Sequence, residues 1–221
     1  MTPPPPRRPG LLPALLGALL LLAAACGGPG DAGPRLSPLP AGATVLAFGD
    51  SITHGVGAGG FEPSPGLTYP ELLASLTGLA VLRSGVPGET TERGLARLPG
   101  VLAQARPALV ILEHGGNDFL GGKPEAETEQ NLTAMVRACQ AAGAQVLLLG
   151  VPQPGLRVKL HPVYARVAQA TQVSLEPDLL PALLADSDVK YDLLHPNAQG
   201  YARLAQGVAA ALRRLGALPS R

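Results

Sequence analysis

Short apolar runs that alternate with helical stretches constrain the fold of this chain more than any other feature. Four runs of four or five almost uninterrupted apolar residues occur at 45–48, 79–82, 108–112 and 145–149, and a shorter one occurs at 173–175. Strands that are apolar along their whole length are buried on both faces, as in a parallel sheet covered by helices. We therefore predict an α/β fold, a three-layer α/β/α sandwich around a central, mostly parallel five-stranded sheet.

The stretches between these runs have the apolar spacing of helices with one buried face. The clearest lies at about 124–142, where Leu132, Met135, Val136 and Cys139 fall on one side of a helix. Cys139 is therefore expected to be a buried apolar residue. The remaining helices are expected at about 69–77, 90–105, 162–170 and 196–215.

Three glycine-containing turns follow predicted strands and carry polar groups. Gly49-Asp50-Ser51 follows the first strand, a turn ending in Gly88 follows the second, and Gly-Gly-Asn-Asp, with Asn117, follows the third. The carboxyl ends of parallel strands meet at one edge of a sheet, so Ser51, Gly88 and Asn117 should lie close together. Taken singly, each turn is also explained by ordinary turn chemistry.

A fourth motif, Asp192-Leu193-Leu194-His195-Pro196, places an acid and an imidazole three residues apart before the last helix. Acyl transfer to a serine needs a base, and the base works best when a third group orients it. Asp192 and His195 could supply that pair to Ser51. The backbone amides of Ser51 and Gly88 and the side-chain amide of Asn117 could then stabilise an oxyanion. Asp192 as a cap and His195 as a surface residue remain the alternatives.

The four motifs, in this order, resemble the blocks of the SGNH (GDSL-type) hydrolase family, over about 45–215. The resemblance is closest to bacterial periplasmic enzymes that act as thioesterase, arylesterase and lysophospholipase. It implies a flavodoxin-like SGNH hydrolase fold, with Ser51 as nucleophile, Asp192 and His195 completing the triad, and Ser51, Gly88 and Asn117 forming the oxyanion hole. No Gly-x-Ser-x-Gly sequence occurs, which disfavours a standard α/β-hydrolase.

The predicted function is hydrolysis of carboxylic esters or thioesters through an acyl-enzyme on Ser51. Two alternatives stay open: a carbohydrate O-acetylesterase of the same fold, and a catalytically silent domain that binds a ligand. No Cys, His and Asp residues have the spacing of metal ligands, so we expect neither a metal nor another cofactor. The partner is expected to be a small ester or thioester, and the protein a monomer. Acyl chain length and leaving group are not encoded in any motif.

The first 25 residues have the pattern of an export signal. Arg7 and Arg8 precede an apolar run at 11–25, which is short for a membrane span. The sequence Ala-Ala-Ala-Cys that ends at Cys26 resembles a bacterial lipobox, which implies lipidation of Cys26 and a membrane anchor in the cell envelope or periplasm. A soluble secreted protein cleaved nearby is the alternative. We expect a Gly/Pro-rich tether at 26–43, the hydrolase domain at 44–216 and a tail at 217–221.

Composition excludes several classes of protein. The chain has 221 residues, 46% hydrophobic and 15% charged, which is too apolar for a disordered protein. Without Arg7 and Arg8 its 17 basic residues become 15, against 16 acidic ones. With three lysines and no tryptophan, nothing indicates a nucleic-acid partner.

Overall fold

The centre of the molecule is a five-stranded parallel sheet with the strand order β2-β1-β3-β4-β5. The strands in this computed structural model are β1 (Thr44–Gly49), β2 (Ala80–Gly85), β3 (Leu109–Glu113), β4 (Gln145–Leu149) and β5 (Ser174–Glu176). All five predicted strands are present, and the predicted α/β class is confirmed. The sheet is parallel throughout, because every connection between neighbouring strands crosses over through helical segments.

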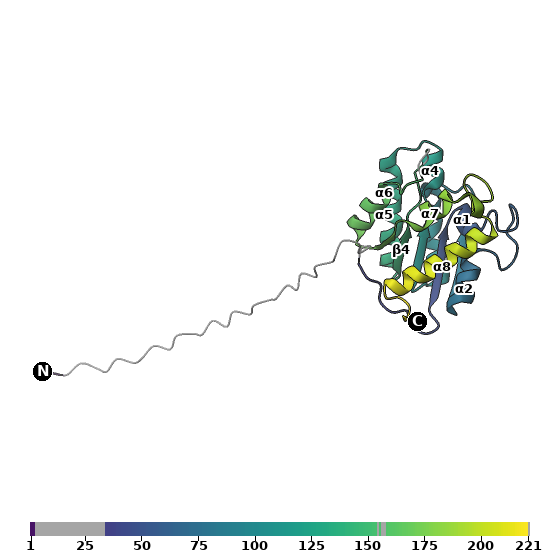
Figure 1. Cartoon of the computed structure of the whole chain (residues 1–221). Coiled ribbons are helices and arrows are strands. Elements are labelled where there is room, and N and C mark those ends of the chain that lie inside the picture. Colours follow the sequence, from purple (N-terminus) through teal and green to yellow (C-terminus); the bar gives the residue numbers. More distant parts are fainter. Residues whose placement is uncertain (3–33, 154, 156–157, 221) are drawn as a thin grey trace. The chain divides into compact units, whose positions relative to one another are not determined.

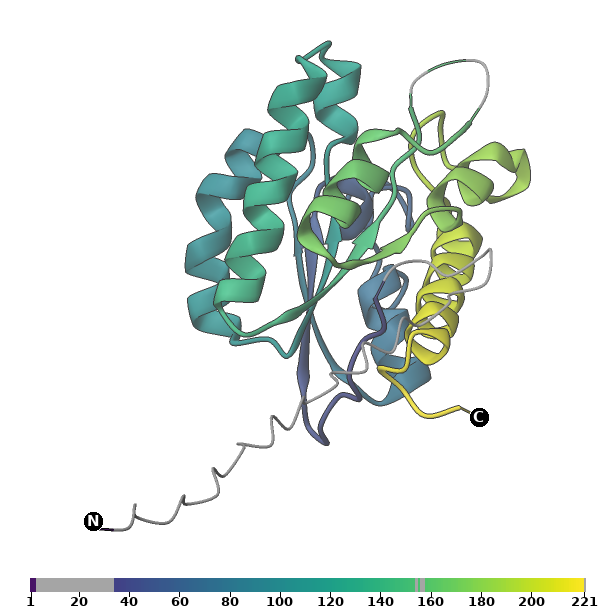
Figure 2. The ribbon, with the colours of Figure 1, turned by 90° about the vertical axis from the view of Figure 1, so that its left-hand side faces the viewer.

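Helices cover both faces of the sheet and complete three layers (Figures 1 and 2). Figure 2 shows helices on both sides of the sheet. On one side α2 packs against α8, and on the other α3 packs against α5, which also contacts α6. Their bounds are α2 (Tyr69–Thr77), α3 (Thr91–Ala105), α5 (Glu125–Ala141), α6 (Val163–Thr171) and α8 (Ala198–Arg214).

Burial of the strands follows their position in the sheet. Every residue of β3 is buried, and so are all but the first residues of β1 and β4, which explains their continuous apolar sequences. The edge strand β2 differs, since none of its residues is fully buried and Leu82 is 45% exposed. The expectation that all strands are covered on both faces therefore fails at β2, whereas the other edge strand, β5, is buried at every residue.

Four short helical segments were not expected from the sequence. They are α1 (Ser51–His54), α4 (Gly116–Leu120), α7 (Leu179–Ala185) and the 3-10 helix η1 (Ser187–Val189). Each has seven residues or fewer, which is too short to show a helical period in the sequence. Two of them, α1 and α4, lie directly after β1 and β3, where turns were predicted.

The structure describes residues 1–2, 34–153, 155 and 158–220. The chain divides into two units, 1–30 and 31–221, and the elements above belong to the second. Cys26, the predicted export signal and the first part of the predicted tether lie outside the described residues. No helix in the described part is both long and apolar enough to cross a membrane.

The described part of the predicted tether, residues 34–43, packs against the domain. Leu36 is 8% exposed, belongs to the hydrophobic core, and its N–H donates to the carbonyl of Leu215 (2.9 Å). The N–H of Leu39 donates to the carbonyl of Ala217 (3.0 Å), and Ala217 is itself buried. The packed chain thus extends beyond 44–216 at both ends, because apolar side chains on either side of those bounds add to the core.

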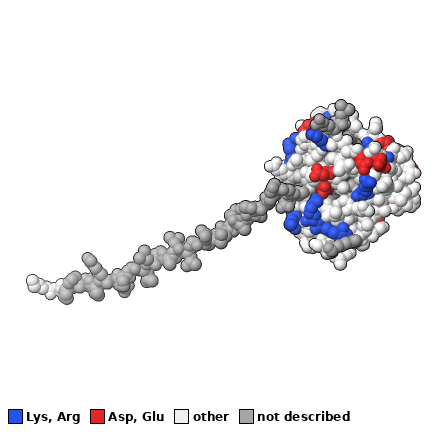
Figure 3. Space-filling model, viewed as in Figure 1, with Lys and Arg blue, Asp and Glu red and all other residues white. Residues whose placement is uncertain are grey.

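Charge on the face shown in Figure 3 is mixed. Basic and acidic side chains both appear there, and most of the surface between them is uncharged. This distribution agrees with the near balance of acidic and basic residues in the sequence.

Candidate active site

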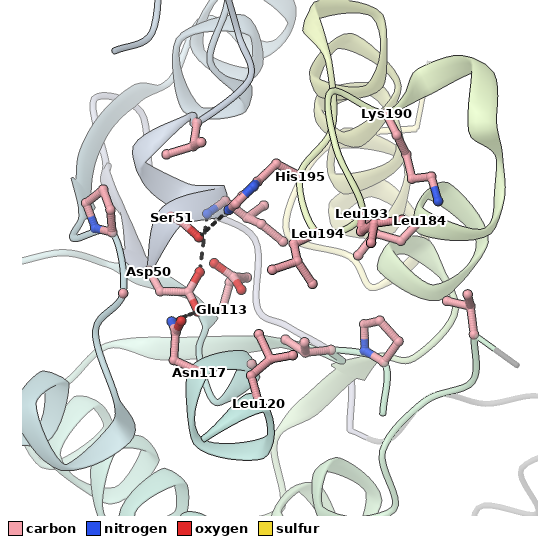
Figure 4. Close-up of a pocket in the computed structure, with 18 of the residues that line it drawn as sticks. Asp50, Ser51, Glu113, Asn117, Leu120, Leu184, Lys190, Leu193, Leu194 and His195 are labelled. Atoms are coloured by element: carbon pink, nitrogen blue, oxygen red, sulfur yellow. Dashed lines mark hydrogen bonds between the residues drawn. The ribbon is translucent and has the colours of Figure 1, made fainter. Parts of the chain in front are cut away.

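A cavity of about 560 Å³ opens at the carboxyl edge of the sheet, beside the ends of β1 and β3. Ser51, Gly88, Asn117 and His195 all line it, so four of the five predicted site residues share one space (Figure 4). The fifth, Asp192, contacts His195. Much of the remaining described wall is apolar and includes Leu120, Val151, Leu184, Leu193 and Leu194.

Ser51 is the first residue of α1 and follows β1 after one residue. Gly49 permits this placement, because a Cβ there would lie 2.2 Å from the backbone oxygen of Glu113 on β3. Asp50 caps the helix, since its Oδ1 accepts from the N–H of Ile52 (3.2 Å). The Gly-Asp-Ser sequence therefore brings two strands close together, starts a helix and presents a hydroxyl at its first turn.

His195 connects Ser51 to Asp192. Its Nε2 lies 2.9 Å from Ser51 Oγ, and its Nδ1 lies 2.8 Å from Asp192 Oδ2. Asp192 Oδ1 also accepts from the backbone N–H groups of Leu194 (2.7 Å) and His195 (2.8 Å). Burial acts to raise the pKa of Asp192, but the hydrogen bonds from His195 and from these N–H groups outweigh it and lower that pKa. Asp192 is therefore an ionised acceptor for the imidazole.

Main-chain bonds on both sides hold the segment that carries His195. The N–H of Tyr191 donates to the carbonyl of His195 (2.9 Å), and Lys190 pairs with Pro196 in an isolated antiparallel bridge. Asn197 then caps α8 by accepting from the N–H of Gly200 (3.0 Å). The imidazole is thus fixed by a short loop that is closed upon itself and anchored to a long helix.

The turn with Gly88 lies against the end of β1. The N–H of Val86 donates to the carbonyl of Gly49 (3.1 Å), and Gly88 has a φ of +72°, a conformation that favours glycine. Beyond the turn, Glu89 is held by two hydrogen bonds from Arg97 (2.6 and 3.0 Å) and by one with His114 (3.2 Å). Burial would raise the pKa of Glu89, but the bonds to His114 and Arg97 prevail and lower it to about 2.

Asn117 joins the first and second motifs from the start of α4. Its Nδ2 donates to Asp50 Oδ2 (3.0 Å) and to the backbone carbonyl of Glu89 (3.0 Å). An amide nitrogen has two hydrogens, and both are engaged. A third acceptor in the cavity would have to share or replace one of these bonds. The adjacent Asp118 does not face the cavity and accepts from the N–H (2.8 Å) and hydroxyl (2.6 Å) of Thr91 at the start of α3.

Two buried carboxyl groups form the floor of the cavity. Asp50 is 4% exposed and Glu113 is fully buried, and both line the cavity. Burial first and the neighbouring Glu113 second raise the pKa of Asp50 well above its ordinary value, and burial also raises the pKa of Glu113. Glu113 Oε2 in turn accepts from the hydroxyl of Thr53 (3.0 Å). The pair therefore retains a proton more readily than exposed carboxyl groups do.

Sequence reasoning identified Ser51, Gly88, Asn117 and His195 on the cavity wall but not the buried acids of its floor or the contacts that hold Asn117. Asp50 and Asn117 are 67 residues apart and Glu89 and Asn117 are 28 apart, so no local spacing signals either contact. The only available signal was the occurrence of acidic residues directly after predicted strands, as at Asp50 and Glu113. Among the described residues, no three His, Cys, Asp or Glu side chains are grouped so that they could hold a metal ion.

Comparison with known proteins places the chain among ester hydrolases. The profile of the GDSL-like lipase/acylhydrolase family matches residues 47–203. Esterase TesA of Pseudomonas aeruginosa is 35% identical over 178 residues, which cover 78% of this chain and 89% of that protein. Thioesterase 1/protease 1/lysophospholipase L1 of Escherichia coli K12 is 31% identical over 180 residues, which cover 78% and 84%. The crystal structure of esterase EstA from Pseudoalteromonas sp., inhibited by monoethylphosphonate, is similar with a TM-score of 0.67 and 25% identity, covering 77% of this chain and 97% of that one.

Proposed function

The chain belongs to the GDSL-like lipase/acylhydrolase family, and from this premise we propose that it hydrolyses its esters through Ser51, His195 and Asp192. Family membership and ester hydrolysis, both predicted from the sequence, are confirmed by the relatives. The assignment of the triad rests on one observation, the unbroken path from Ser51 Oγ through His195 to Asp192 with distances of 2.9 and 2.8 Å. These are hydrogen-bond distances for a nucleophile, its base and the group that orients the base.

The proposed reaction runs in two halves. His195 Nε2 takes the proton of Ser51 as Oγ attacks the carbonyl carbon, and the carbonyl oxygen becomes an oxyanion. The imidazolium gives that proton to the departing alcohol or thiol, which leaves an acyl group on Ser51. Water then attacks the acyl carbon while His195 takes its proton; the bond to Ser51 Oγ breaks, the imidazolium returns the proton to Oγ, and the carboxylic acid is released. Asp192 stabilises the imidazolium in both halves.

We assign stabilisation of the oxyanion to the N–H groups of Ser51 and Gly88 and to the amide of Asn117. Their shared position on the cavity wall supports this assignment. Because both hydrogens of the Asn117 amide already have acceptors, the oxyanion would share or take the hydrogen now bound by Asp50 or Glu89. A negatively charged oxygen is the stronger acceptor, so this exchange is more favourable in the transition state than with the neutral ester.

The apolar wall favours acyl groups longer than acetate. Leu120, Leu193 and Leu194 line the cavity and are each at least 45% exposed, so a bound chain would cover apolar surface that now faces solvent. In a series of p-nitrophenyl esters, kcat/KM should rise from acetate to octanoate. A preference for acetyl groups on carbohydrates would instead favour the O-acetylesterase alternative.

A fluorophosphonate should label Ser51 and no other serine. A base-activated hydroxyl beside oxyanion donors reacts much faster with such reagents than other hydroxyls do. Peptide mapping identifies the labelled residue, and Ser51→Ala should lower kcat on p-nitrophenyl butyrate by about 10³-fold or more. Ser75→Ala, an exposed serine on α2, is the control and should keep the wild-type kcat. Labelling at Ser84, or full activity in Ser51→Ala, would contradict the assignment.

We also propose that residues 1–25 direct export and that Cys26 carries a lipid anchor. The support is the charged start, the apolar run and the lipobox-like end of this segment. Cys26→Ser should move the protein from the membrane fraction to the soluble fraction or leave it as a precursor, with its esterase activity unchanged. Wild-type protein that is soluble and begins beyond Cys26 would show that export occurs without the anchor.

A further inference from the structure

Lys190 differs from the other charged side chains that line the cavity. The described charged groups there are Asp50 and Glu113 on the floor, the imidazole of His195, and Lys190. The two acids are buried and held by bonds to Ile52, Asn117 and Thr53. Lys190 is therefore the one permanent cation on the described part of the wall, and it is one of only three lysines in the chain.

The backbone of Lys190 is fixed by the same loop that fixes His195. Lys190 pairs with Pro196, and its carbonyl accepts from the side-chain amide of Asn197 (3.4 Å). In Figure 4, Leu194, Leu193 and Leu184 lie between Ser51 and Lys190. A ligand that reaches from the nucleophile to this lysine would thus cross an apolar stretch and end at a positive charge.

The acids near Lys190 in the sequence are bound to other groups. Asp192 pairs with His195 (2.8 Å), and Asp186 pairs with Arg203 (2.7 Å). Asp188 Oδ1 faces the hydroxyl of Ser187 (3.5 Å). Lys123, by contrast, contacts both Glu92 and Glu127 at 3.0 Å. Within the described ranges no carboxylate lies within 4.0 Å of Lys190 Nζ, so its charge is available to a ligand in the cavity.

We infer that Lys190 determines specificity by binding an anionic group, a carboxylate or a phosphate, that the ester carries away from its scissile carbonyl. This inference rests on the proposed function, because the scissile carbonyl must lie at Ser51. A cation beside an apolar wall is attracted to an anion more strongly than a cation surrounded by water. A ligand that spans both points would therefore carry its anion apart from the scissile carbonyl, with the apolar stretch of the wall between them.

Matched pairs of substrates measure this selectivity and separate the two sources of charge. The p-nitrophenyl monoester of suberic acid and p-nitrophenyl octanoate have eight-carbon acyl chains with and without a terminal carboxylate. A 1-acylglycerol 3-phosphate and the corresponding 1-monoacylglycerol differ by a phosphate on the alcohol. For each pair, the ratio of kcat/KM for the anionic ester to that for the neutral ester is compared between the wild type and variants.

Lys190→Ala should lower this ratio by about three- to tenfold in one pair, chiefly through KM, and Lys190→Glu should lower it further. Lys190→Arg should keep most of the wild-type ratio, because the charge remains. Lys159→Ala is the control. Lys159 is exposed and does not line the cavity, and its loss changes the net charge by the same amount as the loss of Lys190. A lower ratio in the suberate–octanoate pair identifies the anion as a carboxylate, and a lower ratio in the glycerol pair identifies it as a phosphate. The inference is overturned if neither ratio changes, or if Lys159→Ala changes it as much.

Equilibrium binding tests the inference independently of catalysis. The same four esters are titrated against Ser51→Ala and against the double variant Ser51→Ala, Lys190→Glu. Their dissociation constants from the two proteins are then compared. Loss of selectivity for the anionic ester in the double variant supports the role of Lys190 without any turnover. Turnover by Ser51→Ala at the wild-type rate would instead contradict the Ser51 mechanism, so the two failures are distinguishable.

Discussion

We propose that Asn117 has two functions that use the same two hydrogens. In the structure its amide joins Asp50, which caps helix α1, to the carbonyl of Glu89, just after the Gly88 turn. These bonds orient the amide before any substrate arrives. In the proposed transition state the oxyanion would share or take one of the two hydrogens. The residue is thus both a connector between two motifs and the only side chain assigned to the oxyanion.

Asn117→Ala should lower kcat by about 10² to 10³-fold and change KM little, because the lost bond is strongest in the transition state. The loss of two hydrogen bonds should also cost about 1 to 3 kcal/mol of unfolding free energy. Steady-state kinetics on p-nitrophenyl butyrate and urea unfolding measure these two effects. Asn131→Ala is a suitable control, because Asn131 bonds to Thr91 and does not line the cavity. A folded Asn117→Ala protein with the wild-type kcat would mean that the amide only connects the two motifs.

A largely buried cluster of polar side chains ties helix α3 and strand β3 to the Gly88 turn. Glu89 follows the turn, Arg97 belongs to α3, and His114 follows β3. Arg97 also lies over the ring of Phe48 on β1, 4.1 Å from its centroid, and donates to the hydroxyl of Ser84 on β2 (2.6 Å). One guanidinium therefore contacts three strand or turn segments that converge on the cavity.

Arg97→Ala should lower the unfolding free energy by about 1 to 3 kcal/mol. The side chain of Glu89 is 5% exposed and would lose its cation, whereas the 26% exposure of Arg97 keeps the loss below that of a fully buried pair. Urea unfolding measures the change, and Arg93→Ala, which removes an exposed arginine from the same helix, should have little effect. If Arg97→Ala and Arg93→Ala unfold with the same free energy, the Arg97 cation does not stabilise the buried carboxylate of Glu89.

The destabilisation by Arg97→Ala should depend on pH. The pKa of Glu89 in the folded protein, about 2, is below its ordinary value of 4.5. The stabilisation by the ionised carboxylate is therefore fully present above pH 4.5 and is lost as pH falls toward 2. The difference in unfolding free energy between wild type and Arg97→Ala should narrow over this interval. A difference that stays constant between pH 6 and pH 3 would exclude Glu89 as the source of the effect.

The long elements were predictable because each carries a full period of its pattern. The helix Tyr69–Thr77 and the strand Gln145–Leu149 have the bounds expected from the sequence. The short helices α1 and α4 were not predictable, because four or five residues make little more than one helical turn and cannot show a repeated apolar spacing. Ser51 and Asn117 were nevertheless expected at the correct edge, since strand order and not helix content determines where the turns meet.

At the scale of the whole molecule, both ends of the described domain belong to one packed surface. Leu36 contacts the core, and the backbone near it pairs with the segment after α8 through Leu215 and Ala217. Gln145 at the start of β4 also bonds to the backbone of Ser37 in both directions (2.6 and 3.0 Å). The Gly/Pro-rich composition of residues 26–43 indicated a tether. Single apolar residues such as Leu36 form no periodic pattern, so the sequence did not indicate that this segment packs against the domain.

Leu36→Ala should lower the unfolding free energy by about 2 to 3 kcal/mol, because it leaves a cavity at a side chain that is 8% exposed. Thermal or urea unfolding measures this, and kcat should not change, since Leu36 does not line the cavity. Arg35→Ala, an exposed neighbour, is the control. If the two variants are equally stable, residues 34–43 act as the tether that the sequence indicated.

The residues of the proposed triad are very unequally spaced along the chain, since the acid and the base are three positions apart and the base and the nucleophile are 144 positions apart. A ribosome works from the N-terminus, so it completes Ser51 long before the loop that carries His195. If Ser51 and His195 act as proposed, Ser51 has no base and is an ordinary hydroxyl until that loop is made and reaches the end of β1. On this proposal an unfinished chain would not attack the esters of the cell that makes it, and hydrolysis would begin only when synthesis and folding are complete.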